Sequence, residues 1–472
     1  MSDTTEEDVR LEGMRLDHTI FEDERELDIV ADEVALYLRQ GDYDAVKAFF
    51  DGQELADIAS LLEHMEDEDA LAAMRQLAVV DQARVLGYLR PKPQVELARR
   101  MSREELARLM AAMSHDERVD LYKALDPVAR EQLLPGLAKA ERDDLRRLAS
   151  YPEGTVGSVM TSDYATLLPG MTAPQALEAL RRQASDVETV YYAYVVDADH
   201  KLLGVVTLRD ILLARSRQSV HDLMEPDPVL IRVDGERGEA ASLVARYDLL
   251  ALPVVDAGGR LVGIVTQDDA MDVAEREATE DFYRGSTVQP IEESVREASM
   301  ITLWRARIFW LVLLVFGNIF SGAGIAYFED TIAAHLALLF FLPLLIASGG
   351  NAGAQSATLM VRALATGDVR PGDWSWMLGR EVVIALGLGV TMAIAVSWIG
   401  VWRGGPEIAT VVSLAMVVIV LIGALIGLSL PFLFTRIGRD PATASGPLVT
   451  SLTDVLGVLA YFGIASTLLT LE

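Results

Sequence analysis

At 472 residues the chain exceeds the usual domain size of about 100–200 residues, so we expect several units. It contains no cysteine, which excludes disulfides, thiolate metal sites and a cysteine nucleophile. The formal net charge of −29 is uneven, because residues 1–300 carry 33 basic and 61 acidic groups. Such an acidic surface repels nucleic acid and attracts cations, although an acidic surface that only maintains solubility explains the composition equally well.

The first segment, residues 1–24, has neither the basic nor the apolar region of a secretory signal. It also has no apolar repeat, so we expect a disordered tail. Without a signal, the domains that follow should stay in the cytoplasm.

Residues 25–150 predict an acidic domain that contains only helices. N-cap residue types recur every 12 residues, at Ser102, Ser114 and Asp126, and leucines repeat in step with them. We expect a compact superhelical stack of short helices, whose function the periodicity does not reveal.

Residues 151–272 contain an internal duplication. The segments YVVDADHKLLGVVTLRDI (194–211) and PVVDAGGRLVGIVTQDDA (253–270) align without gaps at a spacing of 59. Each copy predicts two strands joined by a tight turn and followed by a helix. Each copy ends in a Thr-x-x-Asp segment: Thr207 with Asp210, and Thr266 with Asp269.

An acidic linker helix is expected within residues 273–304, continuing from the end of the duplication. Its acids follow one another at helical spacing: Asp269, Asp272, Glu277, Glu280 and Asp281. Like charges this close destabilise a helix unless cations screen them. The run therefore indicates either a cation site shared with another domain or a solvated charged face.

Residues 305–472 predict a membrane domain with five helices. Five apolar stretches are each long enough for a hydrocarbon core of ~30 Å: about 307–327, 335–361, 378–401, 409–434 and 446–471. Pro343 and the pair Gly349–Gly350 interrupt the second stretch, which predicts a broken helix lined by protein or water.

The loop charges predict the orientation of these spans. With the N-terminus inside, seven arginines fall in inside segments: Arg305, Arg307, Arg362, Arg370, Arg380, Arg436 and Arg439. Only Arg403 falls outside, and this bias predicts a cytoplasmic N-terminus and an outside C-terminus.

Asp454 is the one carboxylate expected deep within a span. It should face a water-filled path, or else be neutral and hydrogen-bonded to a neighbouring helix. Thr450 lies on the same helical face, and the second span adds Asn351. One or two carboxylates with neutral oxygens and retained water suit Mg²⁺, whereas the scattered histidines offer no transition-metal site and no enzyme active site.

Three segments carry a family resemblance: YPEGTVGSVMT (151–161), GGNAGAQSATLMVRALATGDV (349–369) and DPATASGPLVTSLTDVLG (440–457). The duplication resembles a tandem CBS domain pair, and nearly the whole chain from about residue 30 resembles the MgtE family of magnesium channels. The resemblance implies a multidomain membrane protein with an all-α N-terminal superhelix, an α/β CBS pair and an all-α domain of five transmembrane helices.

The resemblance further implies a homodimeric Mg²⁺-selective channel of the plasma membrane. Asp454 would line the pore, and Gly446 stands where many members have asparagine. Cytoplasmic Mg²⁺ would bind acids of three regions and close the pore: Asp116 and Asp120; Glu236, Glu239 and Asp248; and Asp269, Asp272, Glu277, Glu280 and Asp281. CBS pairs often bind adenosine nucleotides such as ATP through Thr-x-x-Asp segments, although each segment also suits a helix cap. The alternative function is a cation/H⁺ exchanging carrier in which Asp454 takes up protons.

Overall fold

The computed structural model describes residues 24–289, 291, 295 and 298–469. The chain divides into two compact units, residues 1–275 and 276–472, and each unit has its own hydrophobic core. The tail predicted for residues 1–24 lies outside the described residues, except that Glu24 begins the first helix.

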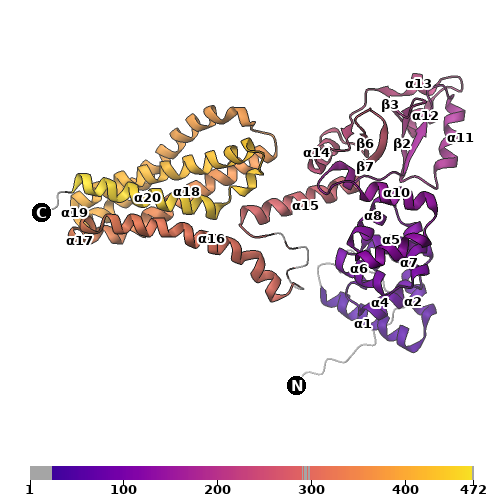
Figure 1. Ribbon diagram of the computed structural model, residues 1–472, viewed down its shortest axis with the longest axis horizontal. Coiled ribbons are helices and arrows are strands. Elements are labelled where there is room, and N and C mark those ends of the chain that lie inside the picture. Colours follow the sequence, from indigo (N-terminus) through magenta and orange to yellow (C-terminus); the bar gives the residue numbers. More distant parts are fainter. Residues whose placement is uncertain (1–23, 290, 292–294, 296–297, 470–472) are drawn as a thin grey trace. The chain divides into compact units, whose positions relative to one another are not determined.

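The first unit opens with a stack of short helices (Figure 1). Their bounds are α1 Glu24–Gln40, α2 Tyr43–Phe50, α3 Leu55–Leu62, α4 Asp67–Met74, α5 Val79–Tyr88, α6 Pro91–Arg100, α7 Arg103–Ala112, α8 His115–Ala124, α9 Pro127–Leu133 and α10 Lys139–Ala149, with a 3₁₀ turn η2 at Leu134–Gly136. From α3 to α10, each helix packs against the second helix after it in the chain. This repeated pairing produces the expected superhelical stack.

The three predicted N-cap residues all stand at N-cap positions, and two of them cap the backbone with their side chains. The Ser102 hydroxyl accepts the backbone N–H of Glu105, and Asp126 accepts those of Val128 and Ala129. Ser114 also stands at the N-cap, before α8, but its side chain accepts no backbone N–H and instead contacts the carboxylates of that helix's first turn.

Two strand-turn-strand units follow, as the duplication predicts. The elements are η3 Val156–Ser158, β1 Tyr164–Leu167, α11 Ala173–Gln183, β2 Thr189–Val196, β3 Leu202–Thr207, α12 Leu208–Leu213, α13 Val220–Leu223, β4 Glu225–Pro226, β5 Ile231–Arg232, α14 Arg237–Tyr247, β6 Ala251–Val255 and β7 Leu261–Thr266. One sheet has the order β1-β2-β3-β4 and the other β5-β6-β7, each with a parallel outer pair and an antiparallel hairpin. Asp197 and Asp256 accept backbone N–H groups within the two hairpin turns, at matching positions.

The helical stack and the second CBS unit share one hydrophobic core. The cluster runs from Leu121 and Leu145 of the stack through Val156 to Val244 and Val265 of the second unit. A separate cluster around the fully buried Tyr194 joins the two sheets. The stack is therefore packed onto the CBS pair and is not an independent lobe of the first unit.

The second unit contains long apolar helices after the end of α15 Gln267–Gly285, which crosses the unit boundary. They are α16 Met300–Tyr327, α18 Ala337–Ala365, α19 Trp374–Arg436 and α20 Gly446–Leu468. Shorter elements join them: α17 Glu329–Ala334 and the 3₁₀ turns η4 at Pro371–Asp373 and η5 at Pro441–Thr443. Four continuous helical stretches among the described residues are long and apolar enough to cross a membrane.

The longest stretch, α19, consists of two helices. Gly405 has a left-handed backbone (φ 82°, ψ 179°) that breaks the helix before Pro406. A Cβ on Gly400 would lie 2.8 Å from the Cα of Ala409, so the segments on either side of the break fold back on each other. The membrane domain therefore has five apolar segments, as predicted.

The prediction of a broken second span is wrong. The helix α18 continues through Pro343 and the glycine pair. Its small residues serve close packing instead, because a Cβ on Gly423 or Gly427 of α19 would clash with the backbone of Gly349 or Gly353.

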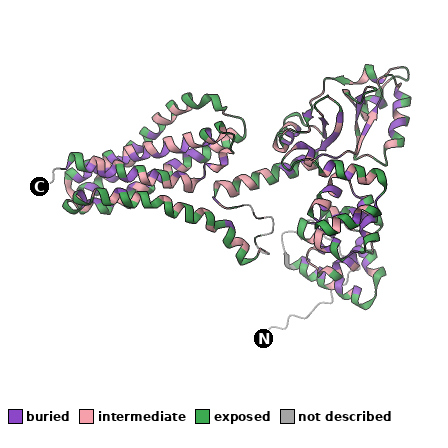
Figure 2. Cartoon of the chain, in the orientation of Figure 1, coloured by how far each residue is buried: buried purple, intermediate pink, exposed green. Residues whose placement is uncertain are grey.

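Burial differs between these helices (Figure 2). In the 18-residue apolar segment of α16 only 6% of the residues are buried, against 56% in the corresponding segment of α19. An apolar helix exposed along most of its length suits a surface that faces lipid.

Candidate ion-binding sites

Two helix beginnings meet at the junction between the helical stack and the second CBS unit. Asp116 lies in the first turn of α8, Asp269 in the first turn of α15, and the two side chains are within hydrogen-bonding reach. Burial raises the pKa of both carboxyl groups, and the charge of Asp116 raises that of Asp269 further. The structure thus brings together two acids of the predicted set.

Three more acids belong to this group, which we call the junction cluster: Glu117, Glu188 and Asp268 join Asp116 and Asp269. Burial and the charge of Asp116 raise the pKa of Glu117 and of Glu188 to about 7. The sequence patterns did not single out these three, because Glu188 lies 71 positions from Glu117 and only the fold joins them. The adjacent acids Asp268 and Asp269 are the feature of the sequence that could have pointed to this cluster.

The junction cluster brings together carboxylate oxygens, the kind of ligand that a hydrated divalent cation takes. The Oδ1 atom of Asp116 is buried and has no hydrogen-bond partner, so the protein leaves one acceptor unsatisfied. Among the described residues no three acidic or histidine side chains converge as a complete metal cage. Mg²⁺ keeps several waters and needs only one or two carboxylates, so an incomplete cage suits it.

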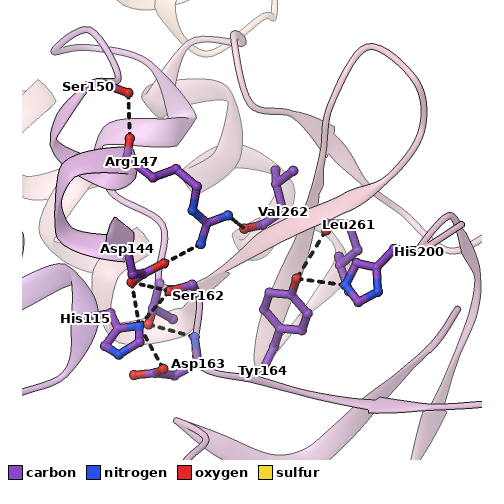
Figure 3. A network of polar contacts seen from close by, with 11 residues as sticks. His115, Asp144, Arg147, Ser150, Ser162, Asp163, Tyr164, His200, Leu261 and Val262 are labelled. Carbon is purple, nitrogen blue, oxygen red and sulfur yellow. Dashed lines mark hydrogen bonds and ion pairs between the residues drawn. The ribbon is translucent and has the colours of Figure 1, made fainter. Parts of the chain in front are cut away.

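Beside the junction cluster, His115 connects the helical stack to the first CBS unit (Figure 3). Its Nδ1 lies 3.0 Å from Asp144 of α10 and 2.9 Å from Asp163, just before β1. Burial alone would lower the pKa of His115, but the two carboxylates outweigh burial and raise it to about 9. Ser162 lies 2.6 Å from the same nitrogen and donates to Asp144, so a protonated imidazole holds acids of two domains together.

Other predicted regulatory acids are exposed, and the structure does not bring them together at one place. Glu236 precedes α14 and Asp248 follows it, separated by about 18 Å of helix, so one ion cannot bind both within a single chain. Glu236, Glu239 and Asp248 are all exposed. Asp120 and Asp272 are exposed as well, one on α8 and one on α15.

The last turns of α15 hold a second acidic group, within the second unit. Glu277, Glu280 and Asp281 are partly buried there. Burial raises the pKa of Asp281, and the charge of Asp440 raises it further. Arg284 forms ion pairs with both Glu280 and Asp440. Asp440 and Arg284 are therefore members of this group that the sequence patterns did not reveal.

Within the apolar helices, Asp454 lies on α20 with its Oδ1 buried and without a partner. Thr450, one turn earlier, donates its hydroxyl to the carbonyl of Gly446, the first residue of the helix. Gly350 of α18 lies close to Thr450, since a Cβ there would come within 2.8 Å of its Cγ2. Asn351 follows Gly350 but is exposed.

The two Thr-x-x-Asp segments differ in surroundings. Thr207 and Asp210 cap α12 reciprocally and remain largely exposed. Thr266 is buried and donates to Asp269, which belongs to the junction cluster. The first segment is therefore the more exposed of the two.

Three known family models match the chain. Residues 342–464 match the MgtE model, described as a divalent cation transporter, and residues 53–154 match the MgtE intracellular N domain. Residues 156–217 and 220–276 match the CBS domain.

Individual relatives cover most of the chain. It is 38% identical to the magnesium transporter MgtE of Thermus thermophilus over 92% of this chain and 97% of the relative, and 30% identical to that of Bacillus subtilis over 92% and 96%. Among solved structures, the cytosolic domain of the Mg²⁺ channel MgtE in complex with ATP matches with a TM-score of 0.50 and 36% identity, covering 52% of this chain and 99% of that one. The chain is a member of the MgtE family of magnesium transporters.

Proposed function

We propose that this protein transports Mg²⁺ across the plasma membrane through a path that Asp454 lines, and that its cytoplasmic acids sense internal Mg²⁺ and close the path. The observation that carries the proposal is the junction cluster. Its carboxylates gather where two domains meet, and three of them, Asp116, Glu117 and Asp269, are partly buried there. Like charges this close destabilise the junction unless protons or cations neutralise them.

The regulatory step follows from the charges of the junction cluster. Bound Mg²⁺ supplies positive charge between Asp116 and Asp269, which would hold α8 against the start of α15. When Asp116 and Asp269 are ionised and unscreened, their repulsion weakens the contact between α8 and the start of α15, while the shared hydrophobic core keeps the stack attached to the CBS pair. A ligand that binds only one of two arrangements shifts the population toward it.

Within the membrane, Asp454 and Thr450 would bind Mg²⁺ that keeps part of its water shell. Gly446 brings no side-chain oxygen, so its carbonyl, Thr450 and Asn351 are the neutral groups we assign to this path. A carboxylate in a membrane span is costly unless it serves such a path. The membrane potential favours inward movement of Mg²⁺.

The test of transport is Mg²⁺ uptake by cells that lack their own Mg²⁺ transporters. Replacing Asp454 with asparagine should abolish growth at limiting Mg²⁺, while Asp373→Asn, at an exposed position of the 3₁₀ turn η4, should leave growth unchanged. Normal uptake by the Asp454→Asn variant would show that this carboxylate does not line the path.

The test of sensing is single-channel recording with stepped internal Mg²⁺. Asp116→Asn or Asp269→Asn should raise the Mg²⁺ concentration for half-closure roughly tenfold, since about 1.4 kcal/mol of binding is lost with one charged ligand. The exposed Glu104→Gln on α7 is the matched control. The same recording separates a channel from a cation/H⁺ exchanging carrier, because a carrier shows no unitary currents and its flux follows the pH gradient.

Further parts of the proposal concern partners and layout. We assign ATP to Thr207 and Asp210, supported by the ATP complex of the matching cytosolic domain. A homodimer would cover the exposed Tyr191, Leu212 and Leu213 of the first CBS unit, which are 64%, 61% and 75% exposed. The helical domain (25–150), the CBS pair (151–272) and the linker (273–304) would lie in the cytoplasm, before the membrane domain (305–472).

A further inference from the structure

An ion pair joins the end of the acidic helix α15 to the turn that precedes the helix carrying Asp454. The guanidinium of Arg284 contacts Asp440 through one terminal nitrogen and Glu280 Oε2 through the other, at 2.9 Å. The three side chains are 38%, 31% and 30% exposed, so the ion pairs are only partly screened by water.

Asp440 connects this pair to α20. Its Oδ2 accepts from Arg284, while its Oδ1 accepts the backbone N–H of Ala442 at 2.8 Å and thereby caps the 3₁₀ turn η5. The turn is anchored, because Ala442 and Ala444 are buried. Ser445 then begins α20, and Asp454 follows two turns later. Arg284 is thus connected, through Asp440 and η5, to the start of the helix that bears Asp454.

We propose that Arg284 is a positioning residue that holds α15 to the turn before α20 and so sets how much internal Mg²⁺ is needed to close the transport path. The inference rests on the proposed function and deepens it. A fixed positive charge on α15 neutralises Asp440 without any ion, so part of the attraction between α15 and this turn is always present. A lower concentration of Mg²⁺ at the remaining acids is then enough to close the path.

Arg284→Gln removes this attraction, whereas Arg284→Lys keeps a positive charge at the same place. In recordings of the full-length protein with stepped internal Mg²⁺, Arg284→Gln should raise the concentration for half-closure about threefold, the size expected for a partly exposed ion pair. Arg284→Lys should restore most of the shift. Arg276→Gln is the matched control, an exposed arginine on the same helix.

Suppose that Arg284→Gln has wild-type conductance at zero internal Mg²⁺. An unchanged or lowered Mg²⁺ concentration for half-closure in this variant would then overturn the inference and leave the proposed function intact. A lowered value would mean that Arg284 competes with Mg²⁺ instead of assisting closure. If the wild-type protein conducts equally at every internal Mg²⁺ concentration, this result contradicts the proposed sensing function, and the inference fails with it. A shift that Lys does not restore would show that the guanidinium shape matters and not the charge, which also contradicts the proposal.

Discussion

His115 holds acids of two domains together, so its loss should loosen the junction. In His115→Gln, Asp144 and Asp163 no longer share a positive charge, and loss of charged hydrogen bonds costs about 1–3 kcal/mol. Hydrogen exchange of the amides of α8 should accelerate in the full chain accordingly. The exposed His221→Gln is the control, and equal exchange in both variants would mean that His115 does not join the domains.

The raised pKa of His115 fixes the sign of a pH effect on the same contact. A histidine whose pKa is about 9 in the folded state, above its ordinary 6.5, contributes stability fully below pH 6.5. That contribution is lost as the pH rises through about 9. Protection of α8 should therefore fall further between pH 6.5 and 9 in the wild type than in His115→Gln, because the change that Glu117 and Glu188 cause near pH 7 is common to both.

Protons should compete with Mg²⁺ at the junction cluster. Glu117 and Glu188 have pKa values raised to about 7, so their protonated forms stabilise the packed junction below pH 4.5, and this stability is lost as the pH rises through about 7. Ionisation creates the negative charge that Mg²⁺ neutralises. Calorimetric titration should show weaker Mg²⁺ binding at pH 6 than at pH 8, and the Glu117→Gln/Glu188→Gln double variant should reduce the difference. Equal Mg²⁺ affinity at both pH values in the wild type would mean that Glu117 and Glu188 take no part in Mg²⁺ binding.

At the scale of elements, the contact between α18 and α19 depends on glycine. A methyl group at Gly423 would clash with the backbone of Gly349, and overpacking of this kind costs about 1–3 kcal/mol. Gly423→Ala should therefore lower the melting temperature of the detergent-solubilised protein. Gly387→Ala is the matched control on α19, because a Cβ there meets no atom within 4 Å. Equal melting temperatures would mean that α19 can move away from α18 without cost.

For the whole molecule, the predicted orientation can be tested on a background without cysteine. Asp368→Cys lies in a segment predicted to be inside and Glu329→Cys in one predicted to be outside, and both positions are exposed. In intact cells a membrane-impermeant maleimide should label only Glu329→Cys. In permeabilised cells it should label both variants. Labelling of Asp368→Cys in intact cells would reverse the topology.

Patterns local in sequence determined much of the architecture. The repeat at a spacing of 59 predicted both CBS units, hydrophobic length predicted five apolar segments, and N-cap spacing predicted the short helices. These features depend on periodicity and on residues a few positions apart, which a sequence displays directly. The family resemblance was confirmed for the same reason, since its motifs are continuous segments.

Only the tertiary structure decided which charged groups meet. Glu188 joins Glu117, and Arg284 reaches Asp440 across 156 positions, because packing of the helices and sheets brings them together. The glycines of the second span were misread as a break, since close approach of a second helix and interruption of the first leave the same small residues in the sequence. The acidic composition is apparent in the sequence, but its concentration into one junction beside His115 depends on contacts between domains.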